Sequence, residues 1–346
     1  MFKKAIACFL IAILTIPTFF ACTQKKEKQI YENFNCFDTY STLTIYGTKE
    51  EVAPFFEEFD KILNHYHKLL DIYNSYDDTV NLKTINDTAT NKEITISKEL
   101  FDVIEYGIEM HEKTDGKLNI ALGAVTSIWH DIREKASNGE ETITLPSQAT
   151  IDEALPHTDI KNVLLDEKSL AIKFTDENLS LDLGGIAKGY VASLLYERLI
   201  FLGCKDFLIN LGGNVVSSGT KPDQTLWAAA IENPFKTDSL GYNESVTLNH
   251  MTLVTSGSYQ RYFIYDGKNY SHIIDPKTGF PPKLFASVTI QAPSDDSCLA
   301  DALSTALFCM NFEDGLELIS SIDNVEALWI FNDGSYKTSE NFGGEK

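Results

Sequence analysis

Two pairs of adjacent glycines, each directly after a short apolar segment, restrict most strongly how this chain can fold. The first pair ends the string DLGG at 182–185 and is followed by helical spacing over 186–202. The second pair is Gly212-Gly213, after the apolar run 207–211. Glycine has no Cβ, so it permits tight turns and lets the backbone approach a ligand closely. The pattern predicts short strands that alternate with helices.

The spacing of apolar residues along the chain predicts the other elements. Neither an internal repeat nor a domain linker interrupts them, so the predicted fold class is α+β, one large unit of mixed strands and helices. The polar stretch 135–148 is expected at the surface. The predicted helices are 52–76, one that begins after Ser97, 186–202 and 299–310, and the predicted strands are 37–46, 163–165, 171–174, 207–211, 227–231, a pair around 253 and 262–265, 287–292 and 327–331.

The N-terminus has the order of an export signal. Residues 1–4 are basic, 5–20 are almost wholly apolar, and Ala21-Cys22 precede a polar run. The apolar run of roughly 16 residues is shorter than the ~20 that span a bilayer. A cysteine directly after a small residue resembles a bacterial lipobox, so we expect a signal peptide over 1–21, a tether over 22–30 lipidated at Cys22, and one domain over 31–346. Plain secretion and an uncleaved anchor remain alternatives.

Charge and cysteine content exclude two classes of site. The chain has 29 Lys and Arg against 50 Asp and Glu, a formal charge of −21. Such a surface repels phosphodiester backbones, so nucleic-acid binding is not expected, and any phosphate must meet a metal ion, a helix N-terminus or a single Lys. No CxxC pair or suitably spaced His accompanies the later cysteines, so zinc is not expected and buried thiols are. These cysteines are Cys36, Cys204, Cys298 and Cys309.

Two segments offer groups for binding phosphate. In DLGGIAKGY, at 182–190, the predicted helix start presents free N–H groups and Lys188 adds a positive charge. The spacing is neither that of a Walker A loop nor GxGxxG. The string NLGGN, at 210–214, offers a second glycine turn that could flank the same ligand. Each turn is also typical of a purely structural joint.

Two further segments offer catalytic and metal-binding side chains. Hydroxyls in TSGSY, at 255–259, are followed by HIIDPKTG, at 272–279, where His272 could act as a general base. The same residues are typical of a turn, and without a GxSxG string they are weak evidence for a hydrolase triad. In a helix, Asp301 and Thr305 share one face and could bind Mg²⁺. Asp301 is alternatively a simple helix N-terminal charge.

Taken together and in this order, DLGGIAKGY, LINLGGN, TSGSY, HIIDPKTG and ADALSTAL resemble the ApbE family, the extracytoplasmic FAD:protein FMN transferases. The upstream strings FDT, YNSYDDTVNLKTIN and GKLNIALGAV agree, so the resemblance covers essentially the whole mature chain. It implies a T-fold-related α+β unit with FAD bound in a cleft.

The resemblance also implies roles for single residues. Asp301, Thr305 and the backbone carbonyl of Gly185 match the Mg²⁺ ligands, and Ser304 stands where some members have a further acidic residue. His272 matches the histidine that helps to deprotonate the acceptor, so His272 and Asp301 are the expected catalytic residues. The positions that match contacts to FAD are Phe37, Tyr76, Ala121, Leu122, Gly123, Asp182, Lys188, Ser256, His272 and Ile274.

The activity implied by the resemblance is Mg²⁺-dependent cleavage of FAD as substrate. FMN passes through a phosphoester link to a Ser or Thr hydroxyl of an acceptor flavoprotein, and AMP is released. The implied acceptors are subunits of membrane redox complexes, similar to RnfG and NqrC. The implied location is extracytoplasmic, with a lipid anchor in the cell membrane, on the periplasmic side or the outer face. An Mg²⁺-dependent FAD pyrophosphatase and a non-catalytic flavin-binding lipoprotein are the alternatives.

Overall fold

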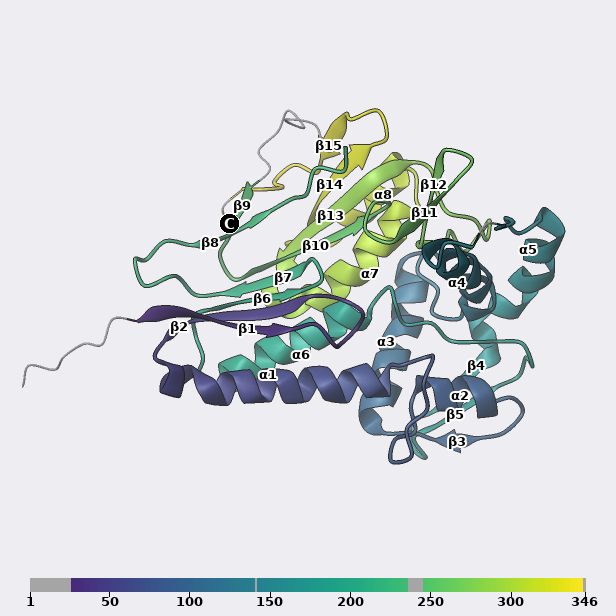
Figure 1. Ribbon diagram of the computed structural model, residues 1–346, viewed down its shortest axis with the longest axis horizontal. Coiled ribbons are helices and arrows are strands. Elements are labelled where there is room, and N and C mark those ends of the chain that lie inside the picture. The colour runs from purple at the N-terminus through teal and green to yellow at the C-terminus, as the bar shows by residue number, and fades with distance from the viewer. Residues whose placement is uncertain (1–25, 141, 236–244, 345–346) are drawn as a thin grey trace, which may run out of the picture.

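An eight-stranded antiparallel sheet forms the centre of the computed structural model, which describes residues 26–140, 142–235 and 245–344 (Figure 1). The strand order is β1-β2-β6-β7-β10-β13-β14-β15. The bounds of these strands are β1 Glu27–Asn33, β2 Ser41–Gly47, β6 Phe207–Leu211, β7 Asn214–Ser218, β10 Met251–Gly257, β13 Phe285–Pro293, β14 Glu326–Phe331 and β15 Tyr336–Thr338.

Three small sheets and eight α-helices complete the described part of the chain. The sheets are β3-β5-β4 and the hairpins β8-β9 and β11-β12. The strands are β3 Ile94–Thr95, β4 Val163–Asp166, β5 Ala171–Phe174, β8 Trp227–Ala230, β9 Ser245–Leu248, β11 Tyr262–Tyr265 and β12 Lys268–Ser271. The α-helices are α1 Lys49–Leu69, α2 Leu82–Thr88, α3 Lys98–Lys113, α4 Gly123–Ser137, α5 Gln148–Ala154, α6 Ala187–Phe201, α7 Ser297–Phe308 and α8 Phe312–Ser320. Short 3₁₀ turns lie at Leu155–Thr158, Ile160–Asn162 and Ser294–Asp296.

Helices α1, α6, α7 and α8 pack on one face of the large sheet, and the β8-β9 hairpin covers part of the other (Figure 1). Successive strand side chains point to opposite faces, so Val254 lies in the core under the helices, whereas Leu253 packs with Trp227 of the hairpin. The central strand β13 is buried along nearly its whole length. Its polar residues Ser287, Thr289 and Gln291 alternate with apolar Val288, Ile290 and Ala292, and both sets are buried because both faces of the strand are covered.

The structure corrects the expectation for the N-terminal segment. Residues 27–30 were expected in a tether but belong to β1, which pairs with β2 from Glu27↔Gly47 to Asn33↔Ser41. The polar sequence EKQIYEN resembles a linker because β1 is an edge strand with many exposed side chains. Residues 27–30 are therefore part of the large sheet. Cys22, the predicted lipidation site, lies outside the described residues.

Other boundaries differ for local reasons. The strand predicted over 37–46 begins at Ser41, since Phe37 and Asp38 adopt left-handed φ values of 58° and 48° in a turn. The helix predicted over 52–76 ends at Leu69 and begins at Lys49 behind a capping box between Thr48 and Glu51. Helix α4 continues to Ser137, so the polar stretch 135–148, which was expected at the surface, begins with the last residues of a helix.

Several predictions are confirmed. Ser97 caps α3 by accepting a hydrogen bond from the amide of Leu100, and α6 and α7 lie within one or two residues of their expected bounds. The four later cysteines are buried free thiols. Within the described ranges, no helix has the length and apolar character needed to cross a membrane.

Candidate active site

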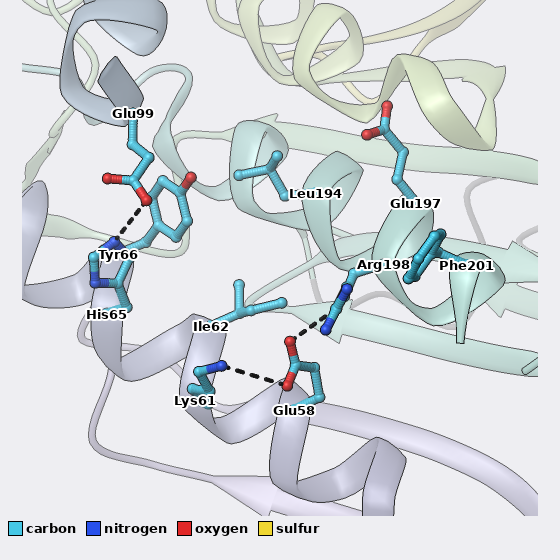
Figure 2. A pocket seen from close by; sticks show the side chains of 10 residues that line it. All are labelled: Glu58, Lys61, Ile62, His65, Tyr66, Glu99, Leu194, Glu197, Arg198 and Phe201. Atoms are coloured by element: carbon cyan, nitrogen blue, oxygen red, sulfur yellow. Dashed lines mark hydrogen bonds and ion pairs between the residues drawn. The ribbon is translucent and has the colours of Figure 1, made fainter. Parts of the chain in front are cut away.

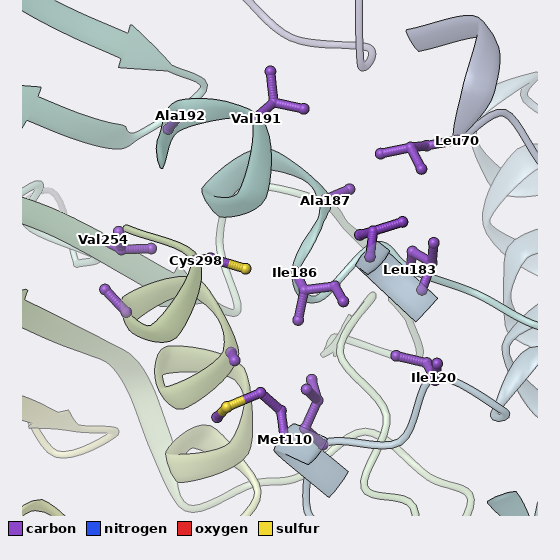
Figure 3. Packing of buried hydrophobic residues seen from close by; sticks show 14 of the residues in the cluster. Leu70, Met110, Ile120, Leu183, Ile186, Ala187, Val191, Ala192, Val254 and Cys298 are labelled. Carbon is purple, nitrogen blue, oxygen red and sulfur yellow. The ribbon is translucent and has the colours of Figure 1, made fainter. Parts of the chain in front are cut away.

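Helices α6 and α7 meet at a glycine. The Gly189 amide donates a hydrogen bond to Oδ2 of Asp301 at 2.7 Å. A Cβ at Gly189 would lie 2.4 Å from the Asp301 Cβ and 2.5 Å from the Ser297 carbonyl oxygen, so no side chain fits there. Apolar residues surround the junction, with Ile186, Ala187 and Val191 near Cys298 of α7 (Figure 3). The helix that follows the first glycine pair is thereby fixed against the helix that carries Asp301.

The three predicted metal ligands are brought together by this packing. Asp301 is only 3% exposed, and Thr305 follows one turn later in α7. The Thr305 hydroxyl oxygen lies 3.5 Å from the position that a Cβ on Gly185 would take. A carboxylate, a hydroxyl and a backbone carbonyl are the oxygen donors that Mg²⁺ takes in proteins, usually completed by water and substrate oxygens. The donor set therefore fits Mg²⁺.

The surroundings of Asp301 act in two opposite directions on the pKa of its carboxyl group. Burial raises the pKa of the Asp301 carboxyl, and Lys188, the Gly189 amide and the Asn214 side chain act in the opposite direction. The Lys188 ammonium is 3.9 Å from Oδ1 of Asp301. Within the described ranges no cluster of three or more His, Cys, Asp or Glu could hold a metal. A cation at Asp301 therefore depends on neutral oxygen donors such as Thr305.

Ser256 lies beside these ligands. Its hydroxyl oxygen is 2.8 Å from that of Ser304 and 3.4 Å from Thr305 Oγ1. The Ser304 hydroxyl also lies 2.9 Å from the backbone carbonyl oxygen of Asp301. The predicted contact residue Ser256 on β10 therefore faces the turn of α7 that carries Ser304 and Thr305.

Asp182 connects the first glycine turn to α4. Its two carboxylate oxygens accept hydrogen bonds from the Gly184 amide and from the Thr126 hydroxyl, each at 2.9 Å. At the start of α4, the Gly123 amide donates to the Ser180 carbonyl at 3.0 Å, and a Cβ on Gly123 would lie 2.4 Å from that oxygen. The predicted contact segment 121–123 is thus placed directly against the segment that leads to Asp182, through an isolated β-bridge between Leu122 and Ser180.

His272 is held in one orientation by the backbone of Arg261. The His272 amide donates to the Arg261 carbonyl at 2.9 Å, and Nδ1 is 3.1 Å from the same oxygen. A carbonyl oxygen only accepts hydrogen bonds, so Nδ1 carries the hydrogen and Nε2 keeps its lone pair. Burial, followed by the charges of Arg261, Lys188 and Arg133, lowers the pKa of His272 to about 3. The ring is therefore neutral at physiological pH.

Arg261 also holds the turn that contains Phe37. Its guanidinium Nη2 donates to the carbonyl oxygens of Phe37 and Asp38 at 2.9 and 2.8 Å. The Phe37 amide donates to Nδ1 of His67 at 3.3 Å. The predicted flavin contact Phe37 is thereby tied to the hairpin that precedes His272.

The Tyr76 hydroxyl and the Ile274 side chain make contacts within the protein. The Tyr76 hydroxyl donates to Oδ2 of Asp71 at 2.8 Å. The side chain of Ile274 is buried with Leu122 and Trp129 in an apolar cluster, so it stabilises the fold next to the site. A ligand contact from Ile274 would have to come from its backbone.

Sequence reasoning missed His130, Arg133 and Arg261, and it selected Tyr76 rather than Tyr73. The Tyr73 ring stacks on His130 with 4.8 Å between centroids, and Arg133 Nη2 is 2.9 Å from Nδ1 of His130. Burial raises the pKa of Tyr73 to about 12, and Asp182, Arg133 and Arg261 also act on it, which places Tyr73 among the site residues. The spacing of Val125, Trp129 and Ile132 predicts a helix here and would have put His130 and Arg133 on one face.

A cavity of about 670 Å³ lies away from these residues, between α1 and α6 (Figure 2). None of the predicted site residues lines it. Its lining residues are Glu58, Lys61, Ile62, His65, Tyr66, Glu99, Leu194, Glu197, Arg198 and Phe201.

Comparisons with known proteins agree with this fold. The sequence model of the ApbE family matches residues 37–329. An FAD:protein FMN transferase of Klebsiella pneumoniae is 30% identical over 289 residues, which are 83% of this chain and 84% of the relative. One from Treponema pallidum is 31% identical over 274 residues, which are 75% of this chain and 72% of the relative.

Solved structures give the same result. The crystal structure of the ApbE protein from Thermotoga maritima has 28% identity and a TM-score of 0.78, with 91% of this chain and 98% of that chain covered. The apo flavinyl transferase ApbE from Pseudomonas stutzeri has 25% identity and a TM-score of 0.75, with 92% and 96% covered. The fold thus defines a single α+β unit built on a large antiparallel sheet, as predicted. The chain belongs to the ApbE family.

Proposed function

We propose that this protein is an Mg²⁺-dependent FAD:protein FMN transferase. The observation that carries the proposal is the junction of α6 and α7. There a buried carboxylate, a hydroxyl and a glycine turn lie together, while the charge of Lys188 acts on both Asp301 and His272. The curated relatives bear the name of this activity. A turnover assay with FAD distinguishes this activity from an FAD pyrophosphatase and from a flavin-binding lipoprotein.

Cleavage of the FAD pyrophosphate requires positive charge and positioning more than covalent chemistry from the protein. Asp301, Thr305 and the Gly185 carbonyl would hold Mg²⁺, which when bound supplies Lewis-acid stabilisation of phosphate charge and a template for phosphate oxygens. Lys188, Arg133 and Arg261 supply the remaining positive field around His272. This local field explains how a chain with a net charge of −21 can take an anionic substrate.

His272 then serves as the proton acceptor. The lone pair on Nε2 takes the proton from the acceptor Ser or Thr hydroxyl, whose oxygen forms a bond to the phosphorus of the FMN half. The bond from that phosphorus to the bridging oxygen breaks, and AMP leaves with the electron pair. Burial, and after it the charges of Arg261, Lys188 and Arg133, hold the pKa of His272 low in the free enzyme. A diphosphate bound among these cations would offset their charge and raise the proton affinity of the ring when the base is needed.

The location proposed for the enzyme is the outer side of the cell membrane, with a lipid anchor on Cys22. The basic, apolar and small-residue order of 1–22 supports this proposal. The acceptors proposed are flavoprotein subunits of membrane redox complexes, because these would share the same surface.

The test is a turnover assay with FAD, Mg²⁺ and an acceptor peptide that contains the target Thr, read by mass spectrometry. The mass of FMN on the peptide, release of AMP and loss of both under EDTA are the expected results. Free FMN and AMP with and without the peptide would instead show a pyrophosphatase. Intact FAD would show a flavin-binding lipoprotein.

A further inference from the structure

The C-terminal end of α6 carries three consecutive exposed apolar side chains. Ile200, Phe201 and Leu202 are 41%, 78% and 39% exposed, and we call them the α6 tip. Phe201 is the most exposed large apolar side chain in the part of the chain that the structure describes. Single exposed apolar residues are common on soluble proteins, but contiguous ones mark contact surfaces.

The α6 tip is held firmly in place. The Arg198 guanidinium lies over the Phe201 ring at 5.3 Å from its centroid, and Arg198 Nε donates to Oε1 of Glu58 on α1 at 2.8 Å (Figure 2). Leu199 and Cys204, on either side of the tip, are buried. The apolar residues are therefore presented from a fixed helix end.

The first described strand begins at the same end of the large sheet. Ile45 of β2 pairs with both Gln29 of β1 and Phe207 of β6, and Phe207 follows the α6 tip by five residues. The start of β1 and the end of α6 therefore lie at one end of the molecule (Figure 1). Exposed Lys26, Lys28 and Lys205 occur here, beside the exposed acidic residues Glu27 and Asp206.

We propose that the α6 tip contacts the lipid bilayer that holds the N-terminal anchor, an inference that rests on the anchorage proposed above. Cys22 precedes Glu27 by five residues, which span at most about 18 Å when fully extended. The bilayer is thus kept close to this end of the domain. Aromatic and aliphatic side chains are favoured at the membrane interface, and nearby lysines are attracted to anionic headgroups.

The test places a fluorescent reporter at the tip of the full-length lipoprotein. Phe201→Trp adds one exposed indole to a chain whose native Trp129, Trp227 and Trp329 are all buried. The protein is reconstituted on vesicles of phosphatidylethanolamine and phosphatidylglycerol, with and without nitroxide-labelled lipid. The matched control is Ile264→Trp on β11, which is 62% exposed and lies away from the α6 tip.

On vesicles, the emission of the tryptophan added in F201W should shift to the blue, and nitroxide-labelled lipid should quench that emission. Neither change is expected for the tryptophan added in I264W. If both variants float with vesicles but F201W behaves like I264W, the contact is overturned and the anchorage stands. If neither the parent chain nor the variants float with the vesicles, both the anchorage and the bilayer contact are overturned. The proposed activity is tested separately by the transferase assay. A concentration-dependent blue shift without vesicles would assign the tip to a second copy and overturn the bilayer contact.

Discussion

Gly189 and Asp301 are joined by a backbone-to-carboxylate hydrogen bond of 2.7 Å, at a point where α6 approaches α7 too closely for a side chain at residue 189. The backbone of one helix thereby fixes the orientation of a buried carboxylate on the other. Since Oδ2 accepts the Gly189 amide, Oδ1 is the oxygen that lies nearer to Lys188. The first glycine turn and the helix that carries Asp301 are therefore held together.

Asp301→Asn should abolish Mg²⁺-dependent transfer. The amide keeps the size of the side chain but removes the only carboxylate among the proposed ligands, and a loss of several kcal/mol of charge stabilisation lowers the rate about 100-fold or more. AMP release and FMN incorporation measure the effect. Asp295→Asn, at an exposed carboxylate before α7, is the control and should retain activity. Equal loss in both variants would remove Asp301 from the metal site.

Gly189→Ala should destabilise the fold, because its Cβ would lie 2.4 Å from the Asp301 Cβ. Overpacking of this kind costs about 1–3 kcal/mol in the free energy of unfolding, which urea denaturation measures. Gly315→Ala in α8 is the matched control, since its nearest neighbours lie at 3.5 Å. This change should leave the protein equally stable or up to about 1 kcal/mol more stable, as alanine favours a helix. Similar costs for both glycines would contradict the close contact.

His272→Gln should slow transfer far more than it weakens FAD binding. Loss of a general base lowers the rate about 10²–10⁴-fold, whereas glutamine can still donate to the Arg261 carbonyl. Single-turnover transfer to the acceptor peptide gives the rate, and quenching of flavin fluorescence gives the affinity. A parallel decline in both quantities would assign His272 to substrate binding alone.

The stability of the protein should depend on pH through the same residue. The folded pKa of His272 is about 3, below its ordinary 6.5, so the unfolded chain takes up a proton first as the pH falls. The stabilising contribution is complete above pH 6.5 and declines between 6.5 and 3, by no more than about 1.4 kcal/mol per pH unit. Denaturant unfolding at pH 8 and pH 5 should therefore show a larger decrease for the parent chain than for His272→Gln. An identical decrease would show that the ring is not held neutral.

Arg261→Lys should separate charge from geometry. Lysine keeps a positive charge near His272 but replaces the planar guanidinium that binds the carbonyls of both Phe37 and Asp38. The KM for FAD should rise as the Phe37 turn loosens, while the acceptor KM stays near that of the parent. Arg198→Lys, on the far side of α6 beside Glu58, is the control and should leave both constants unchanged. A normal KM for FAD in Arg261→Lys would exclude Phe37 from the substrate site.

The sequence predicts the α+β class and the bounds of α6 and α7 because their apolar residues repeat at helical spacing and glycines mark the turn before α6. It does not predict β1, since an edge strand needs few apolar residues when the ladder to β2 supplies its hydrogen bonds. Of the predicted metal ligands, Gly185 lies close to Thr305, and Asp301 lies one turn before Thr305 on α7. The prediction came from the order of the family motifs along the chain, because local sequence patterns carry no information on contacts between residues more than a hundred positions apart.

The other contacts in the site could not be predicted from local sequence patterns. Arg261 binds Phe37 across 224 positions of the sequence, and a left-handed turn at Phe37 has no signal in the string FDT. Tyr73 and Tyr76 are three positions apart, and only the fold shows that Tyr76 donates to Asp71 while Tyr73 stacks on His130.

Helix α6 has one end at the proposed phosphate-binding turn and the other at the exposed tip. Its 15 residues span about 22 Å at 1.5 Å per residue. With the tip on a bilayer, the length of α6 sets the largest distance, about 22 Å, between the lipid and the phosphate-binding turn at its other end. Acceptor proteins would then be selected by the distance of their target hydroxyl from the membrane surface as well as by their sequence. A threonine flush with the membrane would be out of reach, and one raised on a folded domain would be in range.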